Sequence, residues 1–149
     1  MSEDTTLRIE RVIDAPPEVV FRVWTTKDAM EEWYRDGGDD AVAHVLELDV
    51  RPGGGYLIKW GPNGDLTYTE RGEYLEVDPP HRLVMTETLE GAEGGGWANT
   101  KVTVLFEEEA GKTRLILVHE NMPSKEHRDG ALGGWPGFID RVERIALRG

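Results

Sequence analysis

Cysteine is absent from this 149-residue chain. Its absence excludes disulfide bonds, thiolate catalysis and cysteine-ligated zinc. Long apolar runs are also absent: no stretch reaches the roughly 18 residues that a membrane-spanning helix needs. A secretory signal is not expected, because the N-terminal segment MSEDTTLRIERV has no apolar core after a basic start. We therefore expect a cytoplasmic protein without a membrane span.

Positive charge is scarce. The chain has 17 Lys and Arg residues against 29 Asp and Glu residues, for a net charge of −12. Such a surface repels nucleic acid and anionic membranes, and the sequence contains no basic cluster that would offset it. The length and the 38% hydrophobic content suit one domain, residues 1–149, with a core of its own.

Signatures of metal, nucleotide and catalytic sites are missing as well. The histidines do not pair at metal-ligand spacing on one element, and the glycine runs at 53–55 and 94–96 lack the context of a phosphate-binding loop. There is no G-x-S-x-G nucleophile motif, and no two carboxylates stand out as an acid–base pair. We expect no metal and no cofactor, and the sequence favours a protein that is not an enzyme.

The N-terminal third predicts a strand and two short helices. Apolar and polar residues alternate over 6–13, which is typical of a strand. Asp14-Ala-Pro-Pro then ends the strand and starts a helix that runs to about Trp24, because proline is tolerated in a first helical turn. Thr25 or Thr26 can cap a second short helix that reaches Trp33 and Tyr34.

The middle of the chain predicts a series of antiparallel strands. Turn residues at 52–55, 61–64, 78–80 and 109–112 separate short segments rich in β-branched and aromatic residues. The glycine-rich stretch 90–96 predicts a loop. The expected strands cover residues 43–50, 56–60, 66–77, 82–89, 97–107 and 113–120.

The C-terminal segment predicts a long amphipathic helix. Ser124 is a natural N-cap, and one apolar stripe at helical spacing is formed by Trp135, Phe138, Ile139, Val142, Ile145 and Ala146. Proline inside a helix costs about 3 kcal/mol and each glycine about 1 kcal/mol relative to alanine. Gly133 to Gly137, with Pro136 among them, therefore predict a break or bend; in the alternative, the helix begins near Trp135.

These elements predict an α+β fold. A curved antiparallel sheet of about six or seven strands needs cover on one face, and the long helix needs an apolar surface for its stripe. The simplest arrangement lays the C-terminal helix across the concave face of the sheet, with the two short helices following the first strand. Because a helix fills a strongly curved sheet poorly, we expect a cavity between them.

Motifs in order along the chain carry a family resemblance. Residues 13–21 (IDAPPEVVF) look like a family opening, Trp33 matches an aromatic position, and residues 49–54 (DVRPGG) are close to a central turn. Residues 72–84 (GEYLEVDPPHRLV) match the run G-x-Y-x-E-x-x-P-P-x-R-L-V, and residues 113–115 and 134–135 match the end of the pattern. The chain resembles the SRPBCC (START-like, helix-grip) superfamily and, within it, the family of the activator of the heat-shock-protein-90 ATPase. Pro136 departs from that pattern.

The resemblance implies a fold and a pocket. The superfamily includes lipid carriers, hormone receptors, cyclases and co-chaperone domains, so the fold alone selects no activity. We expect binding of a small hydrophobic or amphipathic ligand in an apolar cavity, by a monomer or weak dimer. The alternatives are a cyclase- or hydratase-type enzyme using the same pocket, and a co-chaperone that stimulates a heat-shock chaperone ATPase in a stress response.

The expected pocket lies between the C-terminal helix and the aromatic strand faces. Tyrosine and histidine would supply polar anchors for an otherwise apolar guest. The residues expected to line it are Phe21, Trp24, Tyr56, Ile58, Trp60, Tyr74, His119, Trp135, Phe138, Ile139 and Val142.

Overall fold

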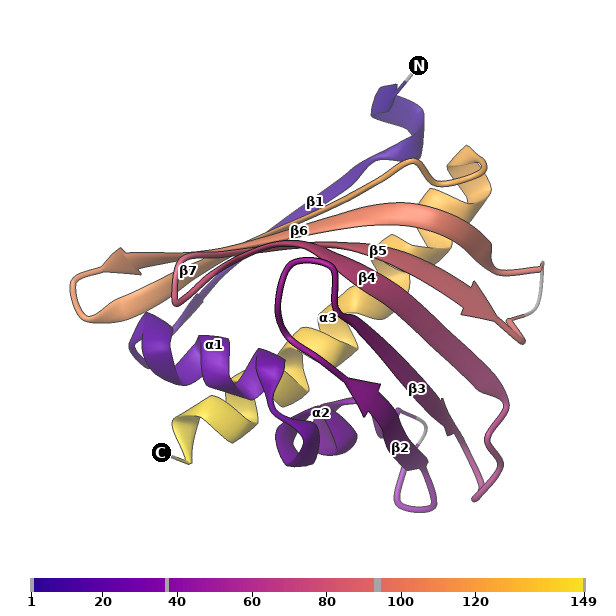
Figure 1. Cartoon of the computed structure of the whole chain (residues 1–149), viewed down its shortest axis with the longest axis horizontal. Coiled ribbons are helices and arrows are strands. Elements are labelled where there is room, and N and C mark those ends of the chain that lie inside the picture. Colours follow the sequence, from indigo (N-terminus) through magenta and orange to yellow (C-terminus); the bar gives the residue numbers. More distant parts are fainter. Residues whose placement is uncertain (1, 37, 93–94, 149) are drawn as a thin grey trace.

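The computed structural model describes residues 2–36, 38–92 and 95–148. Within these ranges, seven strands form one antiparallel sheet in the order β1-β7-β6-β5-β4-β3-β2. The sheet curves strongly, and its concave side holds the helices (Figure 1). The strands are β1 (Leu7–Ile13), β2 (Val42–Leu48), β3 (Gly55–Gly61), β4 (Tyr68–Asp78), β5 (Arg82–Glu90), β6 (Trp97–Glu109) and β7 (Lys112–Glu120).

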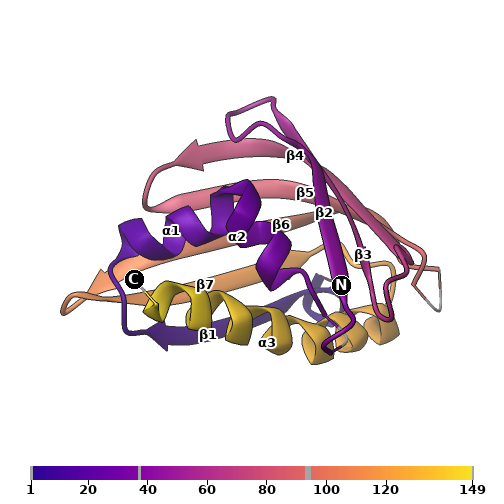
Figure 2. The same cartoon turned by 90° about the horizontal axis from the view of Figure 1, so that it is seen from below.

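The helices lie together on one side of the sheet (Figure 2). A 3₁₀ turn, η1 (Ser2–Thr5), precedes β1, and the α-helices are α1 (Pro17–Thr25), α2 (Lys27–Trp33) and α3 (Lys125–Leu147). The predicted α+β architecture is therefore confirmed. Thr26 occupies the N-cap position of α2, although its side chain makes no capping hydrogen bond. No helix in the described part of the chain is long and apolar enough to cross a membrane.

The core fills the space between the helices and the inner face of the sheet. Alternate residues of each strand point inward, as the period of a strand requires. In β6 and β7 these inward rows include Val104, Phe106, Leu115 and Leu117, each no more than 1% exposed. The last turns of α3 add Ile139 and Val142, both fully buried.

The expected break in the C-terminal helix is wrong. The helix α3 is continuous through Pro136, and it begins at Lys125 rather than near Trp135. The predicted N-cap is confirmed, because Ser124 Oγ accepts a hydrogen bond from the His127 backbone N–H at 3.1 Å. Pro136 removes the bond to the Leu132 carbonyl, but Leu132 lies on the exposed side of the helix, where water can solvate that group. Burial of Ala131 before the proline, and of Ile139 and Val142 after it, then holds the helix together.

Two loops expected from glycine lie partly outside the described residues. The predicted turn at 37–40 includes Gly37, and the predicted loop at 90–96 includes Glu93 and Gly94. The described glycines beside that second gap, Gly91, Gly95 and Gly96, all have positive φ angles, which glycine adopts at no steric cost.

Candidate functional site

A partly open cavity of about 190 Å³ lies under the first half of α3. Its walls come from α2, the residues that follow it, the strands β3 to β6 and α3. Exposed Gly130 and Gly134 stand at its rim, where a side chain on either would meet open space. The lining is formed by Trp33, Tyr34, Asp36, Trp60, Tyr68, Glu70, Glu87, Leu89, Trp97, Gly130, Ala131, Gly134, Trp135 and Phe138.

Strand periodicity places two glutamates on the inner face. Glu87 follows Leu83 and Met85 in the inward row of β5, and the register pairs it with Thr100 of β6. Glu70 occupies the inward row of β4 opposite Leu89. A β-bulge shifts the β5–β6 register immediately after Glu87; such bulges redirect side chains next to functional sites. Both carboxyl groups are at least 95% buried.

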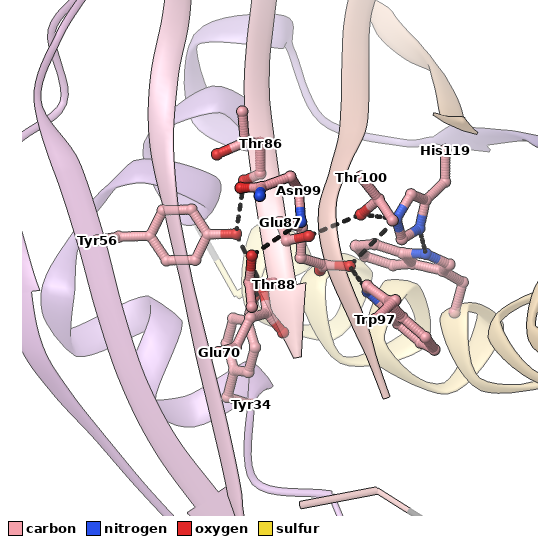
Figure 3. A network of polar contacts seen from close by, with 11 residues as sticks. Tyr34, Tyr56, Glu70, Thr86, Glu87, Thr88, Trp97, Asn99, Thr100 and His119 are labelled. Carbon is pink, nitrogen blue, oxygen red and sulfur yellow. Dashed lines mark hydrogen bonds and ion pairs between the residues drawn. The ribbon is translucent and has the colours of Figure 1, made fainter. Parts of the chain in front are cut away.

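The two carboxyl groups lie close enough for each to shift the pKa of the other. Glu70 Oε2 accepts from the hydroxyls of Tyr34 at 2.7 Å and Tyr56 at 3.2 Å. Glu87 Oε1 accepts from the indole N–H of Trp97 at 3.0 Å. Figure 3 shows Glu87 in the middle of this network, between the tyrosines on one side and Trp97 on the other. Oε2 of Glu87 therefore remains to carry the proton that the pair shares.

Burial makes this pair hold one proton more readily than exposed glutamates do. Loss of solvent raises the pKa of Glu87 well above its usual value, and the neighbouring Glu70 raises it further. Burial also raises the pKa of Glu70, but its hydrogen bonds from Glu87, Tyr34 and Tyr56 oppose that rise. Two carboxylates in contact away from water cannot both be charged at low cost. Glu87 is thus the protonated partner, and Glu70 bears the negative charge.

His119 extends the network as a neutral imidazole. Its Nδ1 accepts from the indole N–H of Trp135 at 3.1 Å, so the proton is on Nε2. Nε2 lies 2.8 Å from Thr100 Oγ and 3.2 Å from Glu87 Oε1. Thr100 donates its own hydroxyl hydrogen to the Glu87 carbonyl, so its oxygen accepts from His119. Burial lowers the pKa of His119 to about 4, and the 3.2 Å contact with Glu87 is therefore not an ion pair.

Aromatic rings surround the remaining space. Trp60 meets Phe138 edge-on at 5.4 Å, and Trp135 stands 6.1 Å from the same ring. The indole N–H of Trp60 is buried and has no acceptor among the described residues. An unmatched buried donor costs about 1–3 kcal/mol, which an acceptor atom of a bound molecule would recover. In the described part of the chain, no three acidic or histidine side chains are arranged to hold a metal ion.

The residues expected at the pocket separate into three groups. Trp60, Trp135 and Phe138 line the cavity. Tyr56 and His119 lie one contact behind it: Tyr56 donates a hydrogen bond to Glu70, and His119 lies 3.2 Å from Glu87. The others are buried in the core away from this lining: Phe21, Trp24, Ile58, Tyr74, Ile139 and Val142.

The sequence reasoning missed the carboxyl pair. The sequence feature that could have revealed it is the two-residue period of a strand. By that period Glu87 shares a face with Met85 and Leu89, and Glu70 shares a face with Gly72 and Tyr74. That period alone places both side chains inward. What it does not give is the register between β4 and β5, which brings the two together.

The architecture identifies the class of protein to which the chain belongs. A curved antiparallel sheet around a long C-terminal helix is the helix-grip fold of START-like proteins. The chain belongs to the family described as Activator of Hsp90 ATPase homolog 1-like protein, which matches residues 14–146. Membership supports a ligand-binding or co-chaperone-like role. A comparison with curated proteins found no match.

Solved structures with the same fold cover nearly the whole chain. A crystal structure of a Chromobacterium violaceum protein is 26% identical, with a TM-score of 0.81, covering 95% of this chain and 96% of that one. A Mycobacterium smegmatis protein is 22% identical, with a TM-score of 0.78 and coverage of 96% and 91%. A Nitrosomonas europaea protein is 17% identical, with a TM-score of 0.78 and coverage of 99% and 97%. The last two likenesses concern the fold alone.

Proposed function

We propose that this protein binds a small, largely apolar molecule in the cavity under α3. The observation that carries the proposal is a space of about 190 Å³ with aromatic walls and a buried polar floor. A dry cavity of about 150 Å³ in another protein is known to hold benzene, so the volume suits one ring with a short substituent. The indoles and Phe138 supply apolar surface, while the carboxyl pair supplies hydrogen-bonding atoms that fix orientation.

The test uses two glycines of α3. Gly134 lines the cavity and Gly133 does not, yet both are exposed, and a Cβ added at either position would meet open space. Gly134→Leu should fill the cavity entrance, whereas Gly133→Leu adds the same side chain next to it. Both changes favour the helix, so neither should impair folding.

The readout is binding of fluorobenzene followed by ¹⁹F NMR. We expect uptake by the wild type and by Gly133→Leu, and loss of uptake in Gly134→Leu. No uptake by the wild type would contradict the proposal, as would equal uptake by the two variants. Native mass spectrometry of gently purified protein would then identify the natural ligand by its mass.

A second candidate is acid–base catalysis in the same cavity, favoured by the single proton shared between Glu70 and Glu87. Such a pair can remove a proton from one atom of a substrate and return it to another. Phenylacetone in D₂O tests this, because a cavity base would exchange the α-hydrogens of the ketone for deuterium. If the wild type exchanges these hydrogens no faster than the Glu70→Gln variant does, acid–base catalysis by the pair is excluded for this substrate.

The chaperone-partner alternative rests on the family match. It predicts a change in the ATPase rate of a heat-shock-protein-90 chaperone when this protein is added. Gly134→Leu separates the two roles, since filling the cavity should leave a surface-mediated effect unchanged.

A further inference from the structure

The ionisable groups of the cavity lining are all acids. Among the described lining residues none is Lys, Arg or His. Arg141 contacts the lining from behind, but its charge is matched by Asp36 at 3.1 Å, and it lies over the Phe138 ring. A buried charge without a counter-charge is strongly disfavoured. The acidic members of the lining are Tyr34, Asp36, Tyr68, Glu70 and Glu87.

The neutral walls favour the opposite sign. Aromatic faces attract cations through their ring quadrupoles, and tryptophan does so most strongly. Trp33, Trp60, Trp97 and Trp135 all line this cavity. A positively charged head would therefore find favourable surfaces even before it reaches the carboxyl pair.

We propose that the cavity binds a small organic cation, namely one ring or a short branched chain bearing an ammonium group, held by the Glu70–Glu87 carboxyl pair. This inference rests on the proposed function and names its ligand class. One positive charge on the guest matches the one negative charge of the pair. The match leaves no net charge in a space that excludes most water.

The side-chain polar contacts of the pair support this assignment. The hydroxyl of Tyr34, which directly follows α2, and that of Tyr56 in β3 contact Glu70, while Trp97 of β6 and neutral His119 of β7 contact Glu87. The first three donate hydrogen bonds to the pair, neutral His119 lies 3.2 Å from Glu87, and none of the four brings a positive charge. The pair is thus held in place but not neutralised, and the missing counter-charge is left for the guest.

A second observation points to a guest at the same place. The unmatched N–H of Trp60 belongs to another wall of the cavity. Among the described residues, the site thus provides both a donor without an acceptor and an anion without a cation. A ring carrying an ether or hydroxyl oxygen as well as the ammonium group would satisfy both.

The experiment compares three probes of similar shape by isothermal titration: 2-phenylethylamine, 2-phenylethanol and 3-phenylpropionate. At neutral pH we expect the amine to bind at least about tenfold more tightly than the alcohol, and the carboxylate not to bind. The double variant Glu70→Gln/Glu87→Gln should remove the preference for the amine. Glu73→Gln, on the exposed side of β4, should keep it.

A spectroscopic measurement avoids dependence on the folding of the double variant. In wild-type protein labelled with ¹³C at the glutamate carboxyls, the amine should move the resonances of Glu70 and Glu87, and the alcohol should move them less. If the alcohol binds as tightly as the amine, the cation inference fails while the proposed function stands. If none of the three probes binds, both fail.

Discussion

The two ends of the concave face differ in chemistry although the same strands build both. At the closed end, under α1 and the last turns of α3, the inward rows are apolar: Leu83 in β5, Phe106 in β6 and Leu115 in β7. Farther along the same rows stand Glu87, Thr100 and His119. Strands β5 and β6 change from apolar to polar at the paired residues Glu87 and Thr100, and β7 changes one inward position earlier, at His119 opposite Val102. The cavity lies at this end. The contrast indicates that one end was built for packing and the other for holding polar atoms away from water.

The helix α3 repeats this difference along its own axis. Its second half buries Ile139, Val142 and Ala146 at no more than 2% exposure. Its first half exposes Gly130 and Gly134, which line the cavity rim. Small residues over the polar end keep the helix from closing the space that the sheet leaves.

The largest expected effect belongs to the closed end. Phe106 is 1% exposed and packs edge-on against Phe21 with ring centroids 5.2 Å apart. Phe106→Ala should lower the free energy of unfolding by about 3–5 kcal/mol, because it leaves a cavity in packed core. Urea unfolding measures the change, and Leu75→Ala at an exposed position should cost no more than about 0.5 kcal/mol. A similar small loss for Phe106→Ala would show that the closed end is loosely packed.

Acid should destabilise the polar end through His119. The pKa of this residue falls from 6.5 to about 4 on folding, so its neutral form stabilises the fold above pH 6.5, and that contribution is lost as the pH falls toward 4. The loss amounts to about 3 kcal/mol. His119→Gln should remove this part of the pH dependence, as measured by urea unfolding at several pH values. An unchanged difference between pH 7 and pH 4 would contradict the assignment.

Glu87 should affect the pH dependence of stability in the opposite direction to His119. Its pKa is raised on folding, so its contribution to stability is present below the ordinary pKa of glutamate and is lost as the pH rises toward the raised value. Glu87→Gln should therefore gain stability relative to the wild type as the pH increases from about 4.5. A constant difference between the two proteins across this range would mean that Glu87 is an ordinary ionised glutamate.

The smallest effect is expected in the first half of α3. Gly133 is exposed, and a Cβ there meets no other atom. Gly133→Ala should raise the melting temperature, since alanine is favoured over glycine in a helix by about 1 kcal/mol. A lower melting temperature would show that the glycine is needed where it stands.

Sequence patterns predicted the fold well because each one is local. Alternation gave the strands, the apolar stripe from Trp135 to Ala146 gave α3, and Ser124 gave its start. The break at Pro136 was wrong because helix propensity is weak against burial on both sides of the proline. The carboxyl pair could not be predicted, since Glu70 and Glu87 lie on different strands whose register depends on bulges.

The central claim is that the polar end holds a carboxyl pair sharing one proton. Titration of ¹³C-labelled glutamate carboxyls by NMR tests it most directly. We expect the Glu87 carboxyl to stay protonated to a pH well above the ordinary pKa of glutamate, with Glu70 responding as Glu87 finally ionises. If Glu70 and Glu87 both lose their protons together with the exposed glutamates, the shared proton and the charge assigned to this cavity are wrong.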